Sequence, residues 1–238
     1  MTEIKDIAFI IPNFNQLYFL RNLVNQLKWY LPNNKIFVVD NGSTSDELRQ
    51  YYFECKDIKV YRYPENDFVA NLSSFIEHEI TNEYYVITDP DLYISPSTPP
   101  NFLEYFKSAI DNYGFHHAGF GLKTDDIPAW NPKAAWIQGD EKALLSTPVD
   151  INGVTGFKAP IDTTFALYKR SNGGWIAPMT GEAWNNCVRL FEIYHMTWYL
   201  HKDYLNEEIK HYFASVLKRD NSKPSAGRNH YNPYNGME

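Results

Sequence analysis

The first 94 residues alternate short β-prone runs with segments of helical periodicity, and no other feature restricts the fold as strongly. Leu20, Leu23, Val24 and Leu27, for example, recur at helical spacing between two continuous apolar runs. The expected strands are 7–11, 36–40, 59–63 and 84–88, and the expected helices are 17–30, 45–53 and 68–79. Such alternation is typical of parallel strands joined by crossover helices. We therefore expect an α/β fold with a Rossmann-like, mostly parallel central sheet and helices on both faces.

The pattern changes after residue 94, where Ser95-Pro96-Ser97-Thr98-Pro99-Pro100 forms a cluster of structure breakers. Beyond this cluster we expect helices at 101–113 and 132–145, strands at 115–123 and 156–168, and a turn at Gly173-Gly174. Residues 221–238 are rich in Asn, Gly, Ser and Pro, which predicts a loose tail or a wrapped arm. We expect one domain over residues 1–220, with residues 1–94 and 95–220 as its two halves.

Charge and cysteine content narrow the classes of partner. The 22 Lys and Arg against 29 Asp and Glu give a net charge of -7. This argues against a nucleic acid partner, because affinity for a duplex comes largely from basic side chains. Cys55 and Cys187 lack the spacing of a zinc site or a disulfide framework. With no leader-like start and no apolar run of ~18 residues, we predict a soluble cytoplasmic protein that reaches a membrane, if at all, through a partner.

Aromatic residues are abundant, since 18 Tyr, 15 Phe and 6 Trp make up 16% of the chain. Most of them are expected to fill the core. Their flat rings also stack on sugars or bases where they reach the surface. The composition is therefore compatible with a site for a sugar or a nucleotide.

Asp89-Pro90-Asp91 comes directly after the fourth expected strand, at the carboxyl edge where open α/β sheets bind ligands. Two Asp residues separated by one position on an extended segment point the same way. Their oxygens are the hard ligands that Mg²⁺ or Mn²⁺ takes when it bridges two phosphates. A turn stabilised by Asp side chains is the other interpretation.

Asp40 ends the second expected strand and is followed by Asn41-Gly42-Ser43-Thr44. Its carboxylate could accept hydrogen bonds from a ribose hydroxyl or a uracil N–H, or it could cap the next helix. A dinucleotide-binding fold also places an acid there, but it requires a glycine-rich turn after the first strand. This chain has Pro12-Asn13-Phe14-Asn15 at that point instead.

The segments 10–15, 38–44 and 89–91, in this order and each at a strand end, resemble glycosyltransferase family 2 and its GT-A relatives. The resemblance covers about residues 7–94. It implies a GT-A fold and a metal-dependent enzyme that transfers a sugar from a nucleotide-diphosphate donor, a UDP-sugar by family habit, with inversion. The acceptor would be a hydroxyl of a glycan, glycoprotein or glycolipid. Residues 1–94 would then be the nucleotide-sugar-binding half and residues 95–220 the acceptor half.

The resemblance also assigns roles to individual residues. Asp89 and Asp91 would bind a Mn²⁺ or Mg²⁺ ion, with Asp89 also at the sugar diphosphate. The residues expected to contact the nucleotide or its sugar are Pro12, Asn13, Asn15, Asp40, Asn66 and Asn71. His195 would be a further metal ligand, because GT-A enzymes can bring a C-terminal His back to the cation and imidazole suits Mn²⁺. The alternative is that His195 is a packed core residue among its aromatic neighbours.

An inverting transfer needs a base that takes the proton from the attacking hydroxyl. Asp162, in a segment expected to form the acceptor side, is the preferred candidate. Asp140 and Glu141, close to Trp136, are the alternatives. A capping or solvated role remains open for each of these carboxylates.

Two other classes of function remain open. A sugar nucleotidyltransferase has a similar α/β plan but would show a glycine-rich, basic loop after the first strand, where this chain has residues 12–15. A non-catalytic sugar- or nucleotide-binding module would keep stacking aromatics without needing both Asp89 and Asp91. Arg170 and Arg189 could pair with a phosphate or be structural.

Overall fold

The computed structural model of the chain describes residues 3–161, 164–175 and 181–222. The helices are α1 (Leu17–Tyr30), α2 (Asp46–Glu54), α3 (Phe68–Glu79), α4 (Phe102–Tyr113), α5 (Ala134–Ala143), α6 (Gly181–Asn185) and α7 (Glu207–Ser222). The strands are β1 (Ala8–Asn13), β2 (Ile36–Asn41), β3 (Ile58–Tyr63), β4 (Tyr84–Thr88), β5 (Leu92–Ile94), β6 (His117–Leu122), β7 (Pro148–Ile151), β8 (Val154–Lys158), β9 (Phe165–Lys169) and β10 (Cys187–His195).

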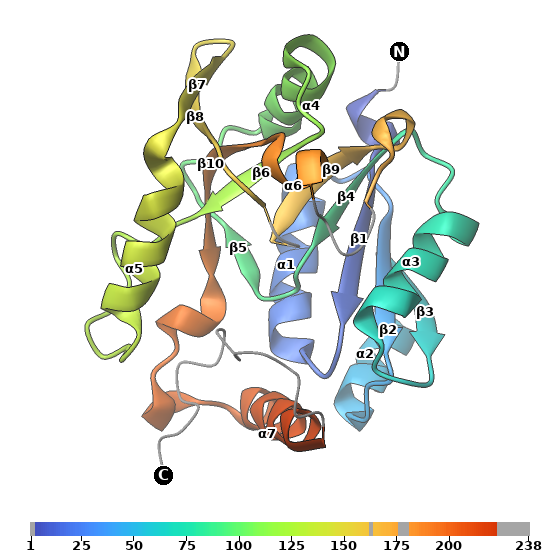
Figure 1. Cartoon of the computed structure of the whole chain (residues 1–238). Helices are drawn as coiled ribbons and strands as arrows, with labels where there is room; N and C mark the ends of the chain where they lie inside the picture. Colours follow the sequence, from blue (N-terminus) through green and yellow to red (C-terminus); the bar gives the residue numbers. More distant parts are fainter. Residues whose placement is uncertain (1–2, 162–163, 176–180, 223–238) are drawn as a thin grey trace.

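Within the described residues the strands form one sheet in the order β3-β2-β1-β4-β9-β6-β10-β8-β7, with β5 paired to β10 (Figure 1). The expected parallel arrangement holds for β3, β2, β1 and β4. Beyond β4 the sheet is mixed, because β9 runs antiparallel between β4 and β6 while β10 returns parallel to β6. The sheet is therefore a parallel half joined through β9 to a mixed half.

Helices cover both faces of the sheet, as expected. The apolar sides of α1 and α4, with Leu48 of α2, pack on one face in the larger core cluster. Leu72, Phe75 and Ile76 of α3 pack on the other face. The bounds predicted for α1, α3 and β4 are confirmed, because each of these segments carries its own apolar pattern.

β1 is buried along its whole length and contains Pro12, which has no N–H to give to a neighbouring strand. β4 pairs only with Ala8, Phe9 and Ile10, whereas β2 pairs along β1 as far as Asn13. Pro12 is tolerated because the parallel pairing with β4 has already ended before it.

The second half departs from the sequence prediction, which contained neither β7 nor β10. The strand expected over 156–168 is two strands, β8 and β9, and Pro160 lies in the segment between them. The expected tail is partly helical, since α7 continues to Ser222, whereas residues 223–238 lie outside the described part. None of the helices in the described residues is long and apolar enough to span a bilayer. Cys55 and Cys187 are free thiols.

Asp111 of α4 anchors this helix to the sheet through three donors. Lys107 and Lys169 bring their Nζ atoms to 2.5 and 2.7 Å from its oxygens, and the Tyr84 hydroxyl donates to Oδ1. Burial opposes ionisation of Asp111, but the three hydrogen bonds outweigh it and lower its pKa to about 2. The side chain is 22% exposed, so solvent screens this cluster only in part.

We expect Asp111→Asn to lower the free energy of unfolding by about 1–2 kcal/mol at pH 7. Because the folded pKa lies below the unfolded value of about 3.9, the contribution is complete above that pH and is lost as the pH falls toward 2. Urea unfolding of both proteins from pH 7 to pH 3 measures the difference, which should shrink on acidification. Asp57→Asn removes a weaker ion pair with Lys28, in which the Asp57 side chain is 57% exposed. This substitution should change the free energy of unfolding little. A pH-independent difference would contradict the explanation.

Candidate active site

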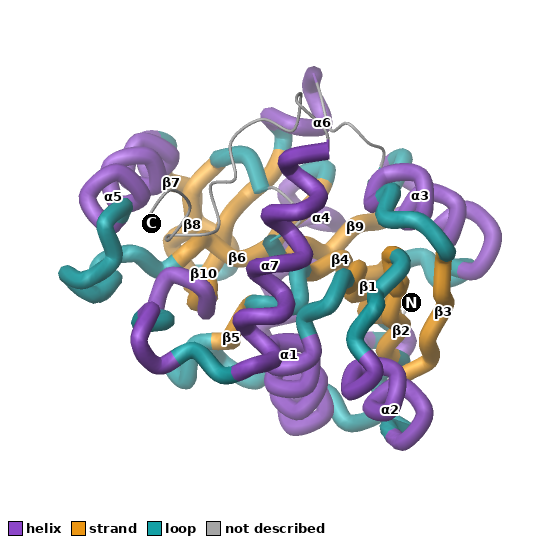
Figure 2. Tube along the Cα trace, turned by 90° about the horizontal axis from the view of Figure 1, so that it is seen from below, coloured by secondary structure: helices purple, strands orange, loops and turns teal. Residues whose placement is uncertain are grey.

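The carboxyl ends of β1, β2 and β4 lie at one edge of the sheet, at the bottom of Figure 1. Seen from below, α7 crosses this edge (Figure 2). Ile209 and Phe213 of α7 pack on Phe19 of α1, and this contact holds the helix across the strand ends. We call this edge, with the loops that leave it, the strand-end edge.

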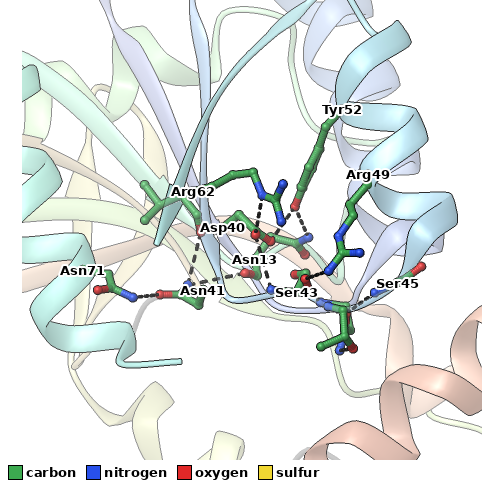
Figure 3. Close-up of polar contacts among 12 residues, drawn as sticks. Asn13, Asp40, Asn41, Ser43, Ser45, Arg49, Tyr52, Arg62 and Asn71 are labelled. Carbon is green, nitrogen blue, oxygen red and sulfur yellow. Dashed lines mark hydrogen bonds and ion pairs between the residues drawn. The ribbon is translucent and has the colours of Figure 1, made fainter. Parts of the chain in front are cut away.

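Asp40, at the end of β2, is fully buried at the strand-end edge. Its Oδ1 accepts a hydrogen bond from the Tyr52 hydroxyl at 3.0 Å, and its Oδ2 accepts from the Ser43 N–H at 3.3 Å. The Nε of Arg62 lies 3.5 Å from Oδ2, and Asn13 Nδ2 donates to the Tyr52 oxygen at 2.8 Å. These partners converge from β1, β3 and α2 (Figure 3). The buried charge is therefore compensated within the chain.

The Asp40 network leaves Asn13 and Arg62 with capacity to bind a ligand. Asn13 is 1% exposed, and its Oδ1 has no hydrogen-bond partner among the described residues. A ligand hydroxyl or N–H would relieve that unpaired acceptor. Burial and the neighbouring Asp40 carboxylate raise the pKa of Tyr52, so its hydroxyl stays protonated as a donor. Direct contact of Asp40 with a nucleotide stays a prediction, because its carboxylate is already covered and bonded.

Asn15 follows β1 in a left-handed conformation with a φ of 55°, which Asn tolerates better than most residues. Its Oδ1 accepts from the N–H groups of Thr44 and Ser45 at 2.8 and 3.2 Å. Its Nδ2 donates to Thr44 Oγ1 at 3.2 Å and to Ser215 Oγ of α7 at 3.1 Å. The side chain therefore ties the β1 loop to α7 and to the start of α2. Its predicted nucleotide contact remains a prediction.

Asn71 and Asn66 lie at the start of α3 and in the loop before it. Asn71 Nδ2 donates to Asn41 Oδ1 at 2.8 Å and to the Glu65 carbonyl at 2.9 Å. Asn66 is half-buried in the same loop. Asn71 therefore fixes the β3–α3 loop against the end of β2. The sugar and nucleotide contacts predicted for both residues remain predictions.

Asp91 and His195 are brought together by the pairing of β5 with β10. Leu92 lies opposite His195 in this antiparallel pair, and the Met196 N–H donates to the Asp91 carbonyl at 2.8 Å. His195 Nε2 consequently lies 3.6 Å from Asp91 Oδ2, with side chains that are 4% and 7% exposed. Two residues that the sequence separates by about a hundred positions thus form one buried pair.

The environment of His195 fixes both its orientation and its charge. Nδ1 shares a hydrogen bond with Thr197 Oγ1 at 2.7 Å, and the ring stacks on Trp198 at 4.7 Å between centroids. Burial lowers the pKa of His195, although the Asp91 charge opposes this shift. The imidazole is therefore neutral near pH 7. A neutral, oriented imidazole beside a carboxylate suits Mn²⁺ better than Mg²⁺.

Asp89 is half-buried after β4, and its N–H donates to the Thr164 carbonyl at 3.2 Å. No cluster of three or more His, Cys, Asp or Glu side chains that could hold a metal occurs within residues 3–161, 164–175 and 181–222. Mg²⁺ and similar ions are, however, commonly held by one or two protein groups together with the phosphates of a substrate. Asp91 and His195 fit a cation that a phosphate-bearing ligand completes.

Of the three candidate bases, two lie within the described residues, and their environments differ. Asp162, the preferred one, lies outside the described residues. Asp140 is exposed on α5. Glu141 faces inward, and its charge, with that of Asp91, opposes the lowering of the His195 pKa that burial causes.

The two arginines considered for phosphate binding have structural partners. Arg189 of β10 donates from Nη1 to Glu141 at 2.6 Å and from Nε to the Pro160 carbonyl at 2.7 Å. Arg170 follows β9, and its N–H donates to the Glu83 carbonyl just before β4. Because β4 begins at the edge opposite the strand-end edge, Arg170 lies away from the candidate site.

Sequence reasoning missed three residues of the strand-end edge: Tyr52, Arg62 and Ser215. Tyr52 follows the buried Leu48 by four positions, and that spacing puts both on the same side of α2. Ile209 and Phe213 have the same spacing and could have indicated α7. Arg62 carries no such signal, because its role depends on the parallel pairing of β3 with β2.

The profile of glycosyl transferase family 2 matches residues 8–170, well over half of the chain. The chain belongs to glycosyl transferase family 2. This membership confirms the resemblance seen in the three strand-end segments and classes the chain among transferase enzymes. The matched region includes Asp40, Asp89 and Asp91, whereas His195 lies beyond it. No curated protein matches the chain in sequence.

A solved structure with a TM-score above 0.5 shares the GT-A fold of this family 2 chain, and two further solved structures score lower. A mannosyltransferase from Pyrobaculum calidifontis, in complex with GDP-Man and Mn²⁺, has a TM-score of 0.54 and 14% identity over 90% of this chain and 64% of its own. Staphylococcus aureus TarS has a TM-score of 0.48 and 14% identity, over 91% of this chain and 44% of its own. Glucosyl-3-phosphoglycerate synthase from Mycobacterium tuberculosis, in complex with Mn²⁺, UDP-glucose and phosphoglyceric acid, has a TM-score of 0.44 and 13% identity, over 69% of this chain and 56% of its own. The chain thus spans less than two thirds of these neighbours.

Proposed function

We propose that the chain is a glycosyltransferase that moves a sugar from a nucleotide-diphosphate donor to an acceptor hydroxyl with the help of a divalent cation. The observation that carries the proposal is the buried Asp91–His195 pair, with 3.6 Å between Nε2 and Oδ2, at the same edge as the Asp40 network. Family 2 membership supports the class of reaction. Family habit alone favours a UDP-sugar as the donor, and the Pyrobaculum neighbour, described with GDP-Man, adds a GDP-sugar to the donors worth testing.

Asp91 and His195 would hold Mn²⁺ or Mg²⁺, with Asp89 at the diphosphate. The cation would supply charge neutralisation to the departing nucleoside diphosphate. Asn13 Oδ1 would accept from a hydroxyl or N–H of the nucleoside, since it has no partner among the described residues. Arg62, held by Asp40, would donate from its half-exposed guanidinium.

In the proposed transfer, the acceptor oxygen forms a bond to the anomeric carbon while the bond from this carbon to the diphosphate oxygen breaks. The electron pair leaves with the nucleoside diphosphate, and the acceptor proton passes to a carboxylate. Asp162 is the proposed base. A single displacement of this kind inverts the anomeric centre, and its transition state has oxocarbenium character.

The proposal includes an acceptor that is a glycan, glycoprotein or glycolipid and a single domain over residues 1–220. Within it, residues 95–220 would provide the acceptor side. The proposed location is the cytoplasm, either free or at a membrane through a partner.

A thermal-shift screen tests the donor site. With Mn²⁺ present, UDP-, GDP- and CMP-sugars at about a hundredfold excess over Kd should include one that raises Tm by roughly 5–10 °C. EDTA should remove most of that rise, because the cation joins the diphosphate to Asp91 and His195. Screening nucleoside triphosphates alongside provides the comparison with a nucleotidyltransferase.

A Tm that responds to nucleoside triphosphates and to no nucleotide sugar would favour the nucleotidyltransferase instead. A shift without any hydrolysis of the donor would favour a binding module. A rise in Tm that EDTA does not reduce would contradict the proposed cation site but would still support the nucleotide site.

A further inference from the structure

Three aromatic rings, two of them exposed and one partly buried, contact one another near the segment between β10 and α7. Trp130 is 53% exposed and Tyr204 is 85% exposed. His201 lies between them, with ring centroids 5.5 Å from Trp130 and 5.2 Å from Tyr204. We call Trp130, His201 and Tyr204 the aromatic platform. Singly exposed rings such as Trp29 are common, but two exposed rings that both contact a third form a cluster, and clustered apolar groups mark interaction sites.

The aromatic platform is linked to the candidate site through Asn131 and Trp198, two buried residues that neighbour it in sequence. Trp198 stacks on His195 at 4.7 Å with an interplanar angle of 14°, and its carbonyl accepts from Asn131 Nδ2 at 3.0 Å. Asn131 is adjacent to Trp130, and His201 follows Trp198 by three residues. The connecting segment, between β10 and α7, lies on the lower side of the molecule with the strand-end edge (Figure 1). The platform is therefore anchored to the buried residues Trp198 and Asn131, which pack beside His195.

Charge around the aromatic platform restricts what can cover it. Along the two segments that carry it, 123–130 and 199–204, the acidic residues Asp125, Asp126 and Asp203 outnumber the lysines, Lys123 and Lys202. Lys123 is already paired with Asp125 and Glu192. A phosphate-rich ligand or an anionic lipid surface would meet no excess of basic groups here. Neutral ligands with many hydroxyls fit better, because carboxylates accept their hydrogen bonds.

Sugar rings match the remaining chemistry. One face of a pyranose presents C–H groups, which pack on the negatively polarised face of an aromatic ring. The tilted rings at the platform, with interplanar angles of 74° and 43° between neighbours, would contact different parts of a chain of sugars. The Tyr199 hydroxyl, donating to Asp126 at 2.7 Å, adds a polar group beside the rings.

We propose that the aromatic platform binds a neutral oligosaccharide, the acceptor glycan, and leads its end toward Asp91 and His195. This inference rests on the proposed function for its role as acceptor, but glycan binding at the platform can be measured without any donor. The platform favours an acceptor with more than one sugar residue, because three neighbouring rings, with centroids 5.5 and 5.2 Å apart, offer more than one surface for stacking.

Saturation-transfer NMR with cellotetraose, chitotetraose, maltotetraose and mannotetraose tests the platform in the full chain. We expect at least one of these to bind, and Trp130→Ala or Tyr204→Ala to weaken its binding about tenfold. Tyr204→Phe should retain binding, because the ring is what stacks. Trp29→Ala, which removes a 74% exposed Trp from α1, is the matched control and should leave binding unchanged.

Failure of all four probes, or equal binding by wild type and Trp130→Ala, would overturn the platform. Flotation with vesicles of phosphatidylcholine and phosphatidylserine that depends on Trp130, in place of glycan binding, would assign the rings to a membrane and overturn it as well. Glycan binding in a protein that neither hydrolyses nor transfers from any nucleotide sugar would refute the proposed function and leave the platform intact.

Discussion

Replacing Asp91 with Asn is expected to reduce donor turnover by about 100-fold or more, because it removes the carboxylate that faces His195 Nε2 at 3.6 Å. The substitution keeps the shape of the side chain, and the neutral His195 leaves no unpaired buried cation behind. Stability should therefore change much less than activity. Hydrolysis of a UDP- or GDP-sugar with Mn²⁺, followed with and without an acceptor, measures the effect.

Two comparisons separate a cation role of Asp91 from a structural one. Asp91→Asn should abolish the part of the thermal shift that EDTA removes from wild type. Asp57→Asn, an exposed acid far from the strand-end edge, should keep full turnover. A folded Asp91→Asn protein with wild-type turnover would remove the cation hypothesis.

Gly119→Ala is expected to cost about 3 kcal/mol or more in the free energy of unfolding. A Cβ at this position of β6 would lie 2.1 Å from the Phe165 carbonyl oxygen and 2.9 Å from the Ala166 Cα, both backbone atoms of β9. Gly119 pairs with Ala166 in the ladder that joins the two halves of the sheet. These backbone atoms cannot move aside as the end of a flexible side chain can. The substitution must therefore separate β6 and β9 locally.

Urea unfolding measures the effect of Gly119→Ala, and Gly139→Ala provides the same chemical change elsewhere. Gly139 lies inside α5, and an added Cβ meets no atom within 4 Å. That substitution should stabilise the protein by about 0.5–1 kcal/mol through helix propensity. Opposite signs for the two variants are the expected result. A Gly119→Ala protein as stable as wild type would mean that β9 is not held against β6 as described.

The parallel half could be predicted from the sequence because its signals are local. α3, for instance, shows its own apolar spacing, and Asp67 provides a capping side chain that accepts from the Ala70 N–H. β10 was not predicted, because its side chains are buried without the regular alternation that indicates a strand. The pairing of β10 with β6 is also interrupted by an irregularity between Arg189 and Glu192, where Phe191 has a φ of 59°.

The candidate site was predictable in its residue types but not in its internal bonding. Strand-end positions identified Asp40, Asp89 and Asp91, because carboxyl ends of parallel strands share an edge. The sequence did not indicate that Tyr52 and Arg62 would enclose Asp40, or that Asn15 would bond with Ser215. Such contacts depend on tertiary packing, which no local periodicity records.

The hydrogen bond between Asn15 and Ser215 joins residues 200 positions apart. During synthesis the parallel half, with Asn15 and Asp40, emerges from the ribosome long before α7 does. Its strands β1, β2 and β3 can pair early, since these pairings join residues much closer in sequence than Asn15 and Ser215. Its strand-end edge stays uncovered until residue 215 has left the exit tunnel. Nascent chains that stall earlier would therefore contain folded strands while Phe19 is not yet covered by α7. The apolar surface around Phe19 is one that a chaperone can recognise.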